Sequence, residues 1–352
     1  MNHCFSFKYL LAGTLIFSVI HFSAAQVHNK QETNNYSIQW KGQYPAVVKK
    51  KSDSKSVNGK YPDEDADRSK STRKKNWFTD LVLGKKSDYP VKPMAILALN
   101  ADTFWIADQG TGSFISVING VGEMIQFGKR DHEDLPSIVD CCFNSRKEIF
   151  FTDSKLNAIY HFFPGIKKLE VLNDSLALEQ PTGIAYSAVN KQFWVVETKA
   201  HRISVLSENG KLIRTLGERG SDAGQFNYPT YIWIDKYGTV YVVDAMNFRI
   251  QIFDKNGIFV SAFGENGDSS GYFSRPKGIA TDSFGHIYVA DALFNVIQVF
   301  DKQGELLYIF GSPGHEKEQF WMPTGIYIDE SNNIYVADSY NSRVQIFSLV
   351  GN

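Results

Sequence analysis

Residues 277–311 read KGIATDSFGHIYVADALFNVIQVFDKQGELLYIFG. The stretch contains four short apolar runs, at 277–282, 287–291, 296–301 and 306–311. The segments between the runs are rich in Gly, Asp and Asn. Tight turns favour these residues, because Gly adopts positive φ at no steric cost and Asp hydrogen-bonds the turn backbone. Four apolar runs joined by such turns predict a small antiparallel sheet of four strands.

The same pattern returns along the chain, and a proline marks each copy. The prolines are Pro93, Pro136, Pro181, Pro229, Pro276 and Pro323, at intervals of 43, 45, 48, 47 and 47 residues. A period in the forties with several short strands per repeat is the signature of a propeller blade. The sequence therefore predicts an all-β fold, a six-bladed β-propeller of four-stranded antiparallel blades.

The last repeat lacks one strand. The chain stops after VQIFSLVGN (344–352), whereas NWFTDLVLG (76–84) resembles IFVSAFG (258–264), the fourth strand of an earlier copy. We predict that the N-terminal strand 77–84 pairs with the C-terminal blade and closes the ring, which leaves no unpaired edge. The predicted propeller domain spans 77–352.

The N-terminal part of the sequence differs in composition from the repeats. Residues 1–25 resemble a secretory signal peptide with cleavage near Ala25, so we expect an extracytoplasmic protein, periplasmic or secreted. Residues 26–76 carry 12 Lys/Arg and 6 Asp/Glu, which predicts a disordered basic tether. Its 49–75 part is either a solvated linker or a contact for an anionic surface. Residues 36–48 could add a short strand or a docking peptide.

The charge and the cysteines exclude two further classes of protein. Residues 77–352 carry a formal net charge of -8, which argues against a nucleic-acid partner. Cys141 and Cys142 are adjacent, and a disulfide between neighbours is strained. We interpret them as two small side chains on opposite faces of one strand, not as a disulfide framework.

Two copies carry a family resemblance. YPTYIWIDKYGTVYVVDAMNFRIQIFDKNGIFVSAFG (228–264) and MPTGIYIDESNNIYVADSYNSRVQIF (322–347) show the elements P-x-G-I, Y-V-A-D, N-x-R-[IV]-Q-[IV]-F and D-x-x-G. These elements resemble the NHL repeat. The resemblance is strong in the last three blades, fair in 181–217 and degenerate in 93–180. It implies a six-bladed propeller but no single chemistry, since relatives bind proteins or RNA, act as extracellular sensors, or are lyases or lactonases.

A carboxylate ends the second strand of every repeat. These residues are Asp108, Asp153, Glu197, Asp244, Asp291 and Asp338, and an arginine follows five residues later in three repeats, at Arg202, Arg249 and Arg343. They are either cation ligands or structural groups that accept backbone N–H bonds from the next loop. Because a group repeated in every blade serves blade construction better than one reaction, we favour the structural role.

An enzyme of this fold would place its ligands around the central channel, which the first strands line. The twelve expected channel positions are Ala95, Leu97, Ile138, Asp140, Gly183, Ala185, Tyr231, Trp233, Gly278, Ala280, Gly325 and Tyr327. Only Asp140 among them ionises near neutral pH, and no His triad is evident. A metal-dependent lyase or lactonase built around Asp140 is the alternative function, but calcium and zinc sites need more ligands. We predict no cofactor.

The remaining candidate is a binding surface on the loops that follow the second strands, which we call the rim loops. Its candidate residues are His201, Tyr231, Trp233, Asn247, Phe248, Phe294, Tyr340 and Asn341. Exposed aromatic side chains among amides suit protein, peptide or glycan recognition. The opposing interpretation is that Tyr231 and Trp233 plug the channel while the loop aromatics pack between blades. We predict a non-catalytic extracytoplasmic binding or scaffold module.

Overall fold

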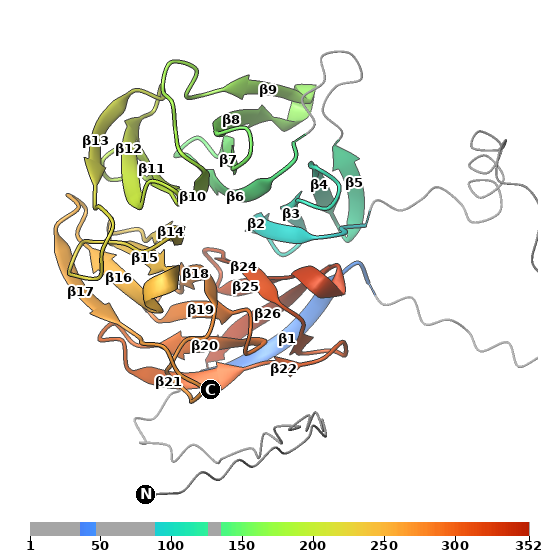
Figure 1. Ribbon diagram of the computed structural model, residues 1–352. Coiled ribbons are helices and arrows are strands. Elements are labelled where there is room, and N and C mark those ends of the chain that lie inside the picture. Colours follow the sequence, from blue (N-terminus) through green and yellow to red (C-terminus); the bar gives the residue numbers. More distant parts are fainter. Residues whose placement is uncertain (1–35, 47–88, 126–134, 352) are drawn as a thin grey trace, which may run out of the picture. The chain divides into compact units, whose positions relative to one another are not determined.

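The computed structural model describes residues 36–46, 89–125 and 135–351. Six four-stranded antiparallel sheets are arranged as blades around a common centre (Figure 1). The predicted fold class, an all-β six-bladed propeller, is confirmed. The predicted signal peptide, the candidate strand 77–84 and most of the predicted tether lie outside the described residues.

Each of the first three blades runs outward from the centre through four consecutive strands. Blade 1 contains β2 (Pro93–Asn100), β3 (Thr103–Asp108), β4 (Ser113–Ile118) and β5 (Val121–Ile125). Blade 2 contains β6 (Ile138–Phe143), β7 (Ile149–Asp153), β8 (Ala158–Phe163) and β9 (Lys168–Val171), with the 3-10 turn η1 (Pro164–Ile166). Blade 3 contains β10 (Pro181–Ser187), β11 (Gln192–Glu197), β12 (Arg202–Ser207) and β13 (Leu212–Leu216).

The next two blades follow the same plan. Blade 4 contains β14 (Pro229–Ile234), β15 (Val240–Asp244), η2 (Ala245–Asn247), β16 (Arg249–Phe253) and β17 (Phe259–Phe263). Blade 5 contains β18 (Pro276–Thr281), β19 (Ile287–Asp291), β20 (Val296–Phe300) and β21 (Leu306–Phe310). The short parallel pair β22 (Ser312–Pro313) and β23 (Gln319–Phe320) precedes blade 6.

Blade 6 is built from both ends of the described chain. It contains β24 (Pro323–Ile328), β25 (Asn333–Asp338), η3 (Ser339–Asn341) and β26 (Arg343–Gly351), with β1 (Tyr36–Tyr44) as its outermost strand. Within the described residues, helical structure is limited to 3-10 turns, and no helix has the length and hydrophobicity needed to cross a bilayer.

The blade order explains why the second strands read as unbroken apolar runs. All five residues of β19, IYVAD, are buried. A strand near the centre of a propeller is covered on both faces by neighbouring blades, so both sets of alternating side chains meet apolar surface. The outer strand β17, FVSAF, has three exposed residues instead, because it lies far from the centre.

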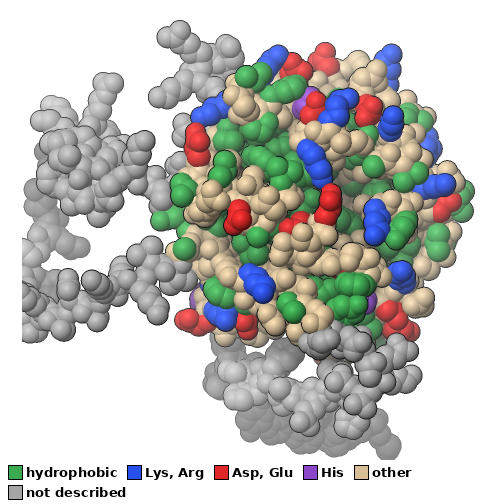
Figure 2. All heavy atoms as spheres, turned by 180° about the vertical axis from the view of Figure 1, so that it is seen from behind, with side chains coloured by type: hydrophobic (Ala, Val, Ile, Leu, Met, Phe, Trp, Pro, Cys, Tyr) green, Lys and Arg blue, Asp and Glu red, His purple; other side chains and the backbone are tan. Residues whose placement is uncertain are grey.

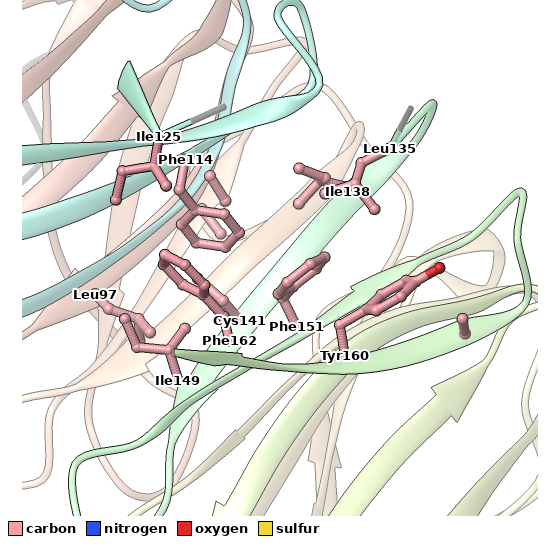
Figure 3. Packing of buried hydrophobic residues seen from close by; sticks show 13 residues of the cluster. Leu97, Phe114, Ile125, Leu135, Ile138, Cys141, Ile149, Phe151, Tyr160 and Phe162 are labelled. Atoms are coloured by element: carbon pink, nitrogen blue, oxygen red, sulfur yellow. The ribbon is translucent and has the colours of Figure 1, made fainter. Parts of the chain in front are cut away.

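The core consists of apolar clusters between successive blades, as Figure 3 shows for blades 1 and 2. Phe114 of β4 faces Phe151 of β7 and Phe162 of β8, with ring centroids 5.0 and 5.4 Å apart. All three side chains are fully buried. These interdigitating aromatic rings fix the spacing of the two blades, since aromatic pairs at such distances pack favourably beyond their buried area.

Glycines allow the first strands to approach one another closely around the centre. A Cβ placed on Gly278 would lie 2.4 Å from the carbonyl oxygen of Thr324 in the next blade. At the same position of their own strands, Gly183 and Gly325 would bring a Cβ within 2.8 and 2.3 Å of the neighbouring backbone. Glycine is therefore required where these first strands meet, because any side chain would push the blades apart.

The strand that completes blade 6 corrects a sequence-based assignment. β1 pairs antiparallel with β26 from Tyr36–Gly351 to Tyr44–Val344, so the outer position belongs to 36–44 and not to 77–84. Blue β1 lies beside red β26 in Figure 1. Ile38 and Trp40 pack against the core of blades 5 and 6, and buried Tyr44 joins the core of blades 6 and 1. A strand that precedes blade 1 in the sequence does complete blade 6, as predicted. The prediction that residues 77–84 form this strand was wrong, because residues 36–44 form it.

Candidate functional site

The six carboxylates at the ends of the second strands are fully buried and accept hydrogen bonds from the protein itself. In blade 6, Asp338 accepts from the backbone N–H of Trp321 at 2.8 Å and from Nε of Arg343 at 2.7 Å. Asp291 of blade 5, which has no following arginine, accepts from four backbone N–H groups, those of Ser274, Arg275, Leu293 and Phe294. These carboxylates therefore tie the loop that enters each blade to the loop after the second strand.

Arginine strengthens this arrangement in three blades. Nε of Arg202 lies 2.8 Å from Glu197, and Nε of Arg249 lies 2.8 Å from Asp244. Arg343 also donates to the backbone carbonyls of Glu316 and Gln319. Charge-assisted bonds of this kind are stronger than neutral ones, so they hold the loops in place and engage the carboxylates within the protein.

The candidate amides of the rim loops make contacts within the protein. Asn247 donates to Gly220 O and Asp244 Oδ2, each at 2.8 Å. Asn341 donates to Gly314 O and Asp338 Oδ2, each at 2.9 Å. Their amide donors are thus engaged in holding the loops, although the loops themselves remain at the surface.

The other rim-loop candidates differ in exposure. His201 is buried, and its Nδ1 accepts from the backbone N–H of Tyr228 at 3.1 Å. Phe248 packs against the core between blades 4 and 5, and Phe294 is half-buried. Tyr340 is 60% exposed. The structure does not gather these side chains into one hollow, and none of them lines either of the two cavities described next.

The first cavity, which we call the central funnel, has a volume of about 420 Å³ and lies among the first strands. Nine of the twelve expected channel positions line it: Ala95, Leu97, Asp140, Ala185, Tyr231, Trp233, Gly278, Gly325 and Tyr327. Its mouth includes Asn144, Ser145 and Lys147, in the loop between β6 and β7. The funnel therefore opens beside the loops that follow the first strands. Consecutive strands are antiparallel, so this is the face opposite the rim loops.

This placement separates Tyr231 and Trp233 from the other rim-loop candidates. Tyr231 is buried in one apolar cluster with Val139 of β6 and Ile279 of β18, so it bridges three blades. Trp233 is half-buried, and its indole N–H donates to Thr281 Oγ1 at 2.9 Å. Tyr231 thus narrows the channel, while the ring of Trp233 forms part of the wall of the funnel.

The second cavity, which we call the side groove, has a volume of about 660 Å³ and shares Trp233 and Ile234 with the central funnel. Turns of blades 4, 5 and 6 line it, including Tyr237 and Phe284, which are 69% and 44% exposed. Trp233 and Ile234 therefore border both cavities. The sequence analysis did not predict the side groove. Its residues come from three turns that are spaced 47 residues apart in the sequence, and only the circular arrangement of the blades brings them together.

The side groove contains charged side chains of both signs. Asp235, Asp282 and Asp329 lie at the same turn position of successive blades and accept backbone N–H bonds of their own turns at 2.9 Å. Lys236, Lys302 and Glu330 are exposed at its margin. Figure 2 shows the side of the propeller that lies behind in Figure 1. On this side, charged side chains of both signs are mixed with apolar side chains.

Asp140 supplies the one carboxyl group among the residues that line the funnel. Burial raises its pKa from the ordinary value of 3.8 to about 7, although backbone N–H bonds oppose the shift. Oδ1 accepts from Cys141 N at 2.9 Å, and Oδ2 accepts from Ile184 N of the next blade at 3.1 Å. Cys141 and Cys142 are buried free thiols whose pKa values burial raises, so neither is a reactive thiolate.

The described residues around Asp140 include no cluster of His, Cys, Asp and Glu side chains that could hold a metal ion. Across the described ranges 36–46, 89–125 and 135–351, no three His, Cys, Asp or Glu side chains are grouped so that they could hold a metal ion. Catalytic zinc typically has three protein ligands of this kind, whereas calcium also takes backbone and amide carbonyl oxygens. The described residues thus offer Asp140 no cluster of His, Cys or further carboxylates for the metal-dependent lyase or lactonase considered from the sequence.

The six blades define the chain as a six-bladed β-propeller. A family model described as NHL repeat matches residues 320–347, and one described as 6-bladed beta-propeller matches residues 168–254. The resemblance drawn from the sequence is confirmed. No curated protein sequence matches the chain.

Solved structures of the same fold have varied functions. A virginiamycin B lyase from Staphylococcus aureus has 16% identity and a TM-score of 0.55, with 74% of this chain and 96% of the lyase covered. An auxiliary nutrient binding protein from Bacteroides thetaiotaomicron has 13% identity and a TM-score of 0.59, with 74% and 70% covered. A gluconolactonase from Xanthomonas campestris has 12% identity and a TM-score of 0.56, with 75% and 88% covered. At such identities the likeness shows the fold alone.

Proposed function

We propose that this propeller is a non-catalytic binding module that holds a segment of a peptide or protein in the central funnel and the side groove. The observation that carries this proposal is that two cavities lie side by side and share Trp233 and Ile234 in their walls. Ligand sites are typically hollows of about 300–1,000 Å³ with apolar walls and a few placed polar groups. The funnel and the groove each fall in that range.

The chemistry of the hollow favours a peptide over a neutral glycan. Aromatic side chains from three blades offer rigid apolar surface. They are Trp233 and Tyr237 of blade 4, Phe284 of blade 5 and Tyr327 of blade 6. Exposed Lys and Glu side chains border the same groove, and charges of both signs complement a chain that itself carries both. The blades hold these turns rigidly, so little ordering would be needed on binding.

We also propose that the module acts outside the cytoplasm. The signal-like pattern of residues 1–25 supports this placement, and one protein of the same fold is an auxiliary nutrient binding protein from Bacteroides thetaiotaomicron. In this proposal the basic segment 49–75 connects the module to an anionic surface, which the excess of Lys and Arg over Asp and Glu supports.

A series of acetylated, amidated tripeptides Gly-X-Gly, with each natural side chain at X, tests the proposal. Binding to the full chain is measured by NMR and by tryptophan fluorescence. We expect at least one member to bind in the millimolar range and to lose at least about tenfold in affinity in Trp233→Ala. Trp321→Ala is the matched control, since Trp321 is 43% exposed and its carbonyl accepts from Tyr340 in a rim loop.

The two tryptophan variants distinguish the two faces. If Trp321→Ala lost peptide affinity and Trp233→Ala did not, the binding site would lie at the rim loops and not in the two cavities. No binding of any member up to about 20 mM would contradict a peptide-binding function. The affinities of the two variants are compared only if both have the circular dichroism spectrum and the melting temperature of the wild type, which shows that both are folded.

A further inference from the structure

Asp140 and Tyr231 both line the central funnel, and each carries a polar group at its end. Asp140 is the only Asp or Glu among the residues that line the funnel. The Tyr231 side chain is 4% exposed, and its hydroxyl has no hydrogen-bond partner in the described part of the chain. A buried hydroxyl without a partner is costly and suggests that something else supplies the bond.

The two groups interact across the funnel. Tyr231 lies on β14 of blade 4 and Asp140 on β6 of blade 2, yet the charge of Asp140 contributes to raising the pKa of Tyr231, after burial. Both carboxyl oxygens of Asp140 already accept one backbone N–H, which fixes the carboxyl group in place. Each oxygen has a second lone pair for a donor in the funnel.

Aromatic rings form part of the wall of the funnel. Trp233 and Tyr327 meet edge to face, with ring centroids 5.8 Å apart and planes at 80°. Both line the funnel. The indole N–H of Trp233 is already engaged by Thr281, so the ring offers the funnel its π system and not a donor. Aromatic faces beside a carboxylate attract a cation through the ring quadrupole and the charge together.

The surrounding charges favour a cation as well. The linings of the funnel and the side groove together contain five Asp/Glu and three Lys. Lys147, the only Lys among the funnel residues, lies at the mouth, where it pairs with Glu330 at 3.2 Å and lies over the ring of Phe143. The interior of the funnel is left with one acidic group and no compensating cation among its lining residues.

We infer that the central funnel binds an alkylammonium group, which Asp140 and the Tyr231 hydroxyl accept by hydrogen bonds while Trp233 and Tyr327 flank its alkyl chain. This inference rests on the proposed function and names the chemical group that enters the funnel. A lysine side chain of a peptide and a free small amine share this chemistry. The cation restores charge balance to a carboxylate that burial otherwise disfavours.

Two tripeptides of equal length test the inference. Acetyl-Gly-Lys-Gly-amide carries the ammonium group, whereas acetyl-Gly-norleucine-Gly-amide has a similar alkyl chain without it. We expect the lysine peptide to bind the full chain at least about tenfold more tightly, and Asp140→Asn to abolish this preference. Glu123→Gln is the control, because Glu123 is an exposed carboxylate on β5 that pairs with Lys167.

A second variant keeps the test valid if Asp140→Asn fails to fold. Tyr231→Phe removes only the hydroxyl, and we expect it to weaken the lysine peptide about threefold to tenfold without changing the norleucine peptide. Pentylammonium is the third probe. Binding equal to that of the lysine peptide indicates a small-amine ligand, and weaker binding indicates that the peptide backbone contributes.

The dependence on pH is an independent readout. Binding of the lysine peptide should strengthen as pH rises from 5.5 to 8, because Asp140 ionises with a pKa of about 7 while the lysine remains charged. The first strands packed against β6 are β2 and β10, and they contribute no titratable side chain to the funnel apart from Tyr186 of β10. The other titratable groups that line the funnel are Cys141, Cys142, Lys147, Tyr231 and Tyr327.

The outcomes separate this inference from the proposed function. Equal binding of the lysine and norleucine peptides, with loss in Trp233→Ala, overturns the ammonium site but retains the binding module. An unchanged preference in Asp140→Asn or in Tyr231→Phe also overturns it. If no tripeptide of any kind binds, both proposals fail.

Discussion

The indole N–H of Trp40 donates to Oε1 of Gln345 at 3.2 Å, although the two residues lie 305 positions apart. The amide nitrogen of Gln345 donates in turn to Asp338 Oδ2 at 3.1 Å. The first strand of the described chain is thereby linked to the buried carboxylate of the last blade. Closure of the ring depends on this connection as well as on the backbone pairing of β1 with β26.

Trp40→Ala should therefore destabilise the whole propeller. We expect the free energy of unfolding to fall by about 2–3 kcal/mol, since the substitution removes a half-buried ring and one of the two donors to Gln345 Oε1. Chemical denaturation followed by fluorescence measures the change. Lys41→Ala, at an exposed position of the same strand, should change stability by less than about 0.5 kcal/mol. Equal stability of the two variants would show that β1 contributes little.

Asp338→Ala should destabilise far more than loss of an exposed ion pair. The Arg343 side chain is 9% exposed, so removal of its carboxylate partner leaves a buried charge and a freed backbone N–H at Trp321. We expect a loss of about 3–5 kcal/mol in the free energy of unfolding. Glu123→Ala breaks the exposed pair with Lys167 and should cost at most about 1 kcal/mol. Similar losses in both variants would contradict a structural role for this carboxylate.

Gly278→Ala tests the close approach of the first strands. The added methyl group would lie 2.4 Å from Thr324 O, so the two blades must separate, and we expect a loss of about 1–3 kcal/mol. Gly165→Ala is the matched control, because a methyl group added there would meet no atom within 4 Å and the backbone is not left-handed. A melting temperature as high for Gly278→Ala as for Gly165→Ala would refute the packing argument.

Asp140 should make stability depend on pH in a defined direction. Its pKa is about 7 in the folded protein and about 3.8 ordinarily, so between these values the folded state binds one more proton than the unfolded state. The free energy of unfolding of the wild type, relative to Asp140→Asn, is therefore highest below pH 3.8 and falls as pH rises to 7. The slope is at most about 1.4 kcal/mol per pH unit. Denaturation curves of the wild type and of Asp140→Asn at several pH values measure this slope. A difference in stability that rises with pH or stays constant would contradict the raised pKa of Asp140.

The repeats made the fold predictable, whereas the candidate site was predictable only in part. Proline spacing and the runs ending in a carboxylate indicated six blades, because local turn chemistry and strand patterning recur in each copy. The position of Asp140 among the channel residues was also readable from strand alternation. The closing strand was assigned to 77–84 instead of 36–44, because short apolar runs of equal length look alike until their partner strand is known.

The sequence by itself determined the number of blades, the order of strands within each blade and the side chains that face the centre, since these follow from periodicity and alternation. Only the tertiary structure decided which segment completes blade 6 and which face is hollow. It alone joined Trp233 to the turns of blades 5 and 6, and it alone left the Tyr231 hydroxyl buried in the funnel with Asp140. These relationships depend on how the blades meet around the ring, which no local pattern encodes.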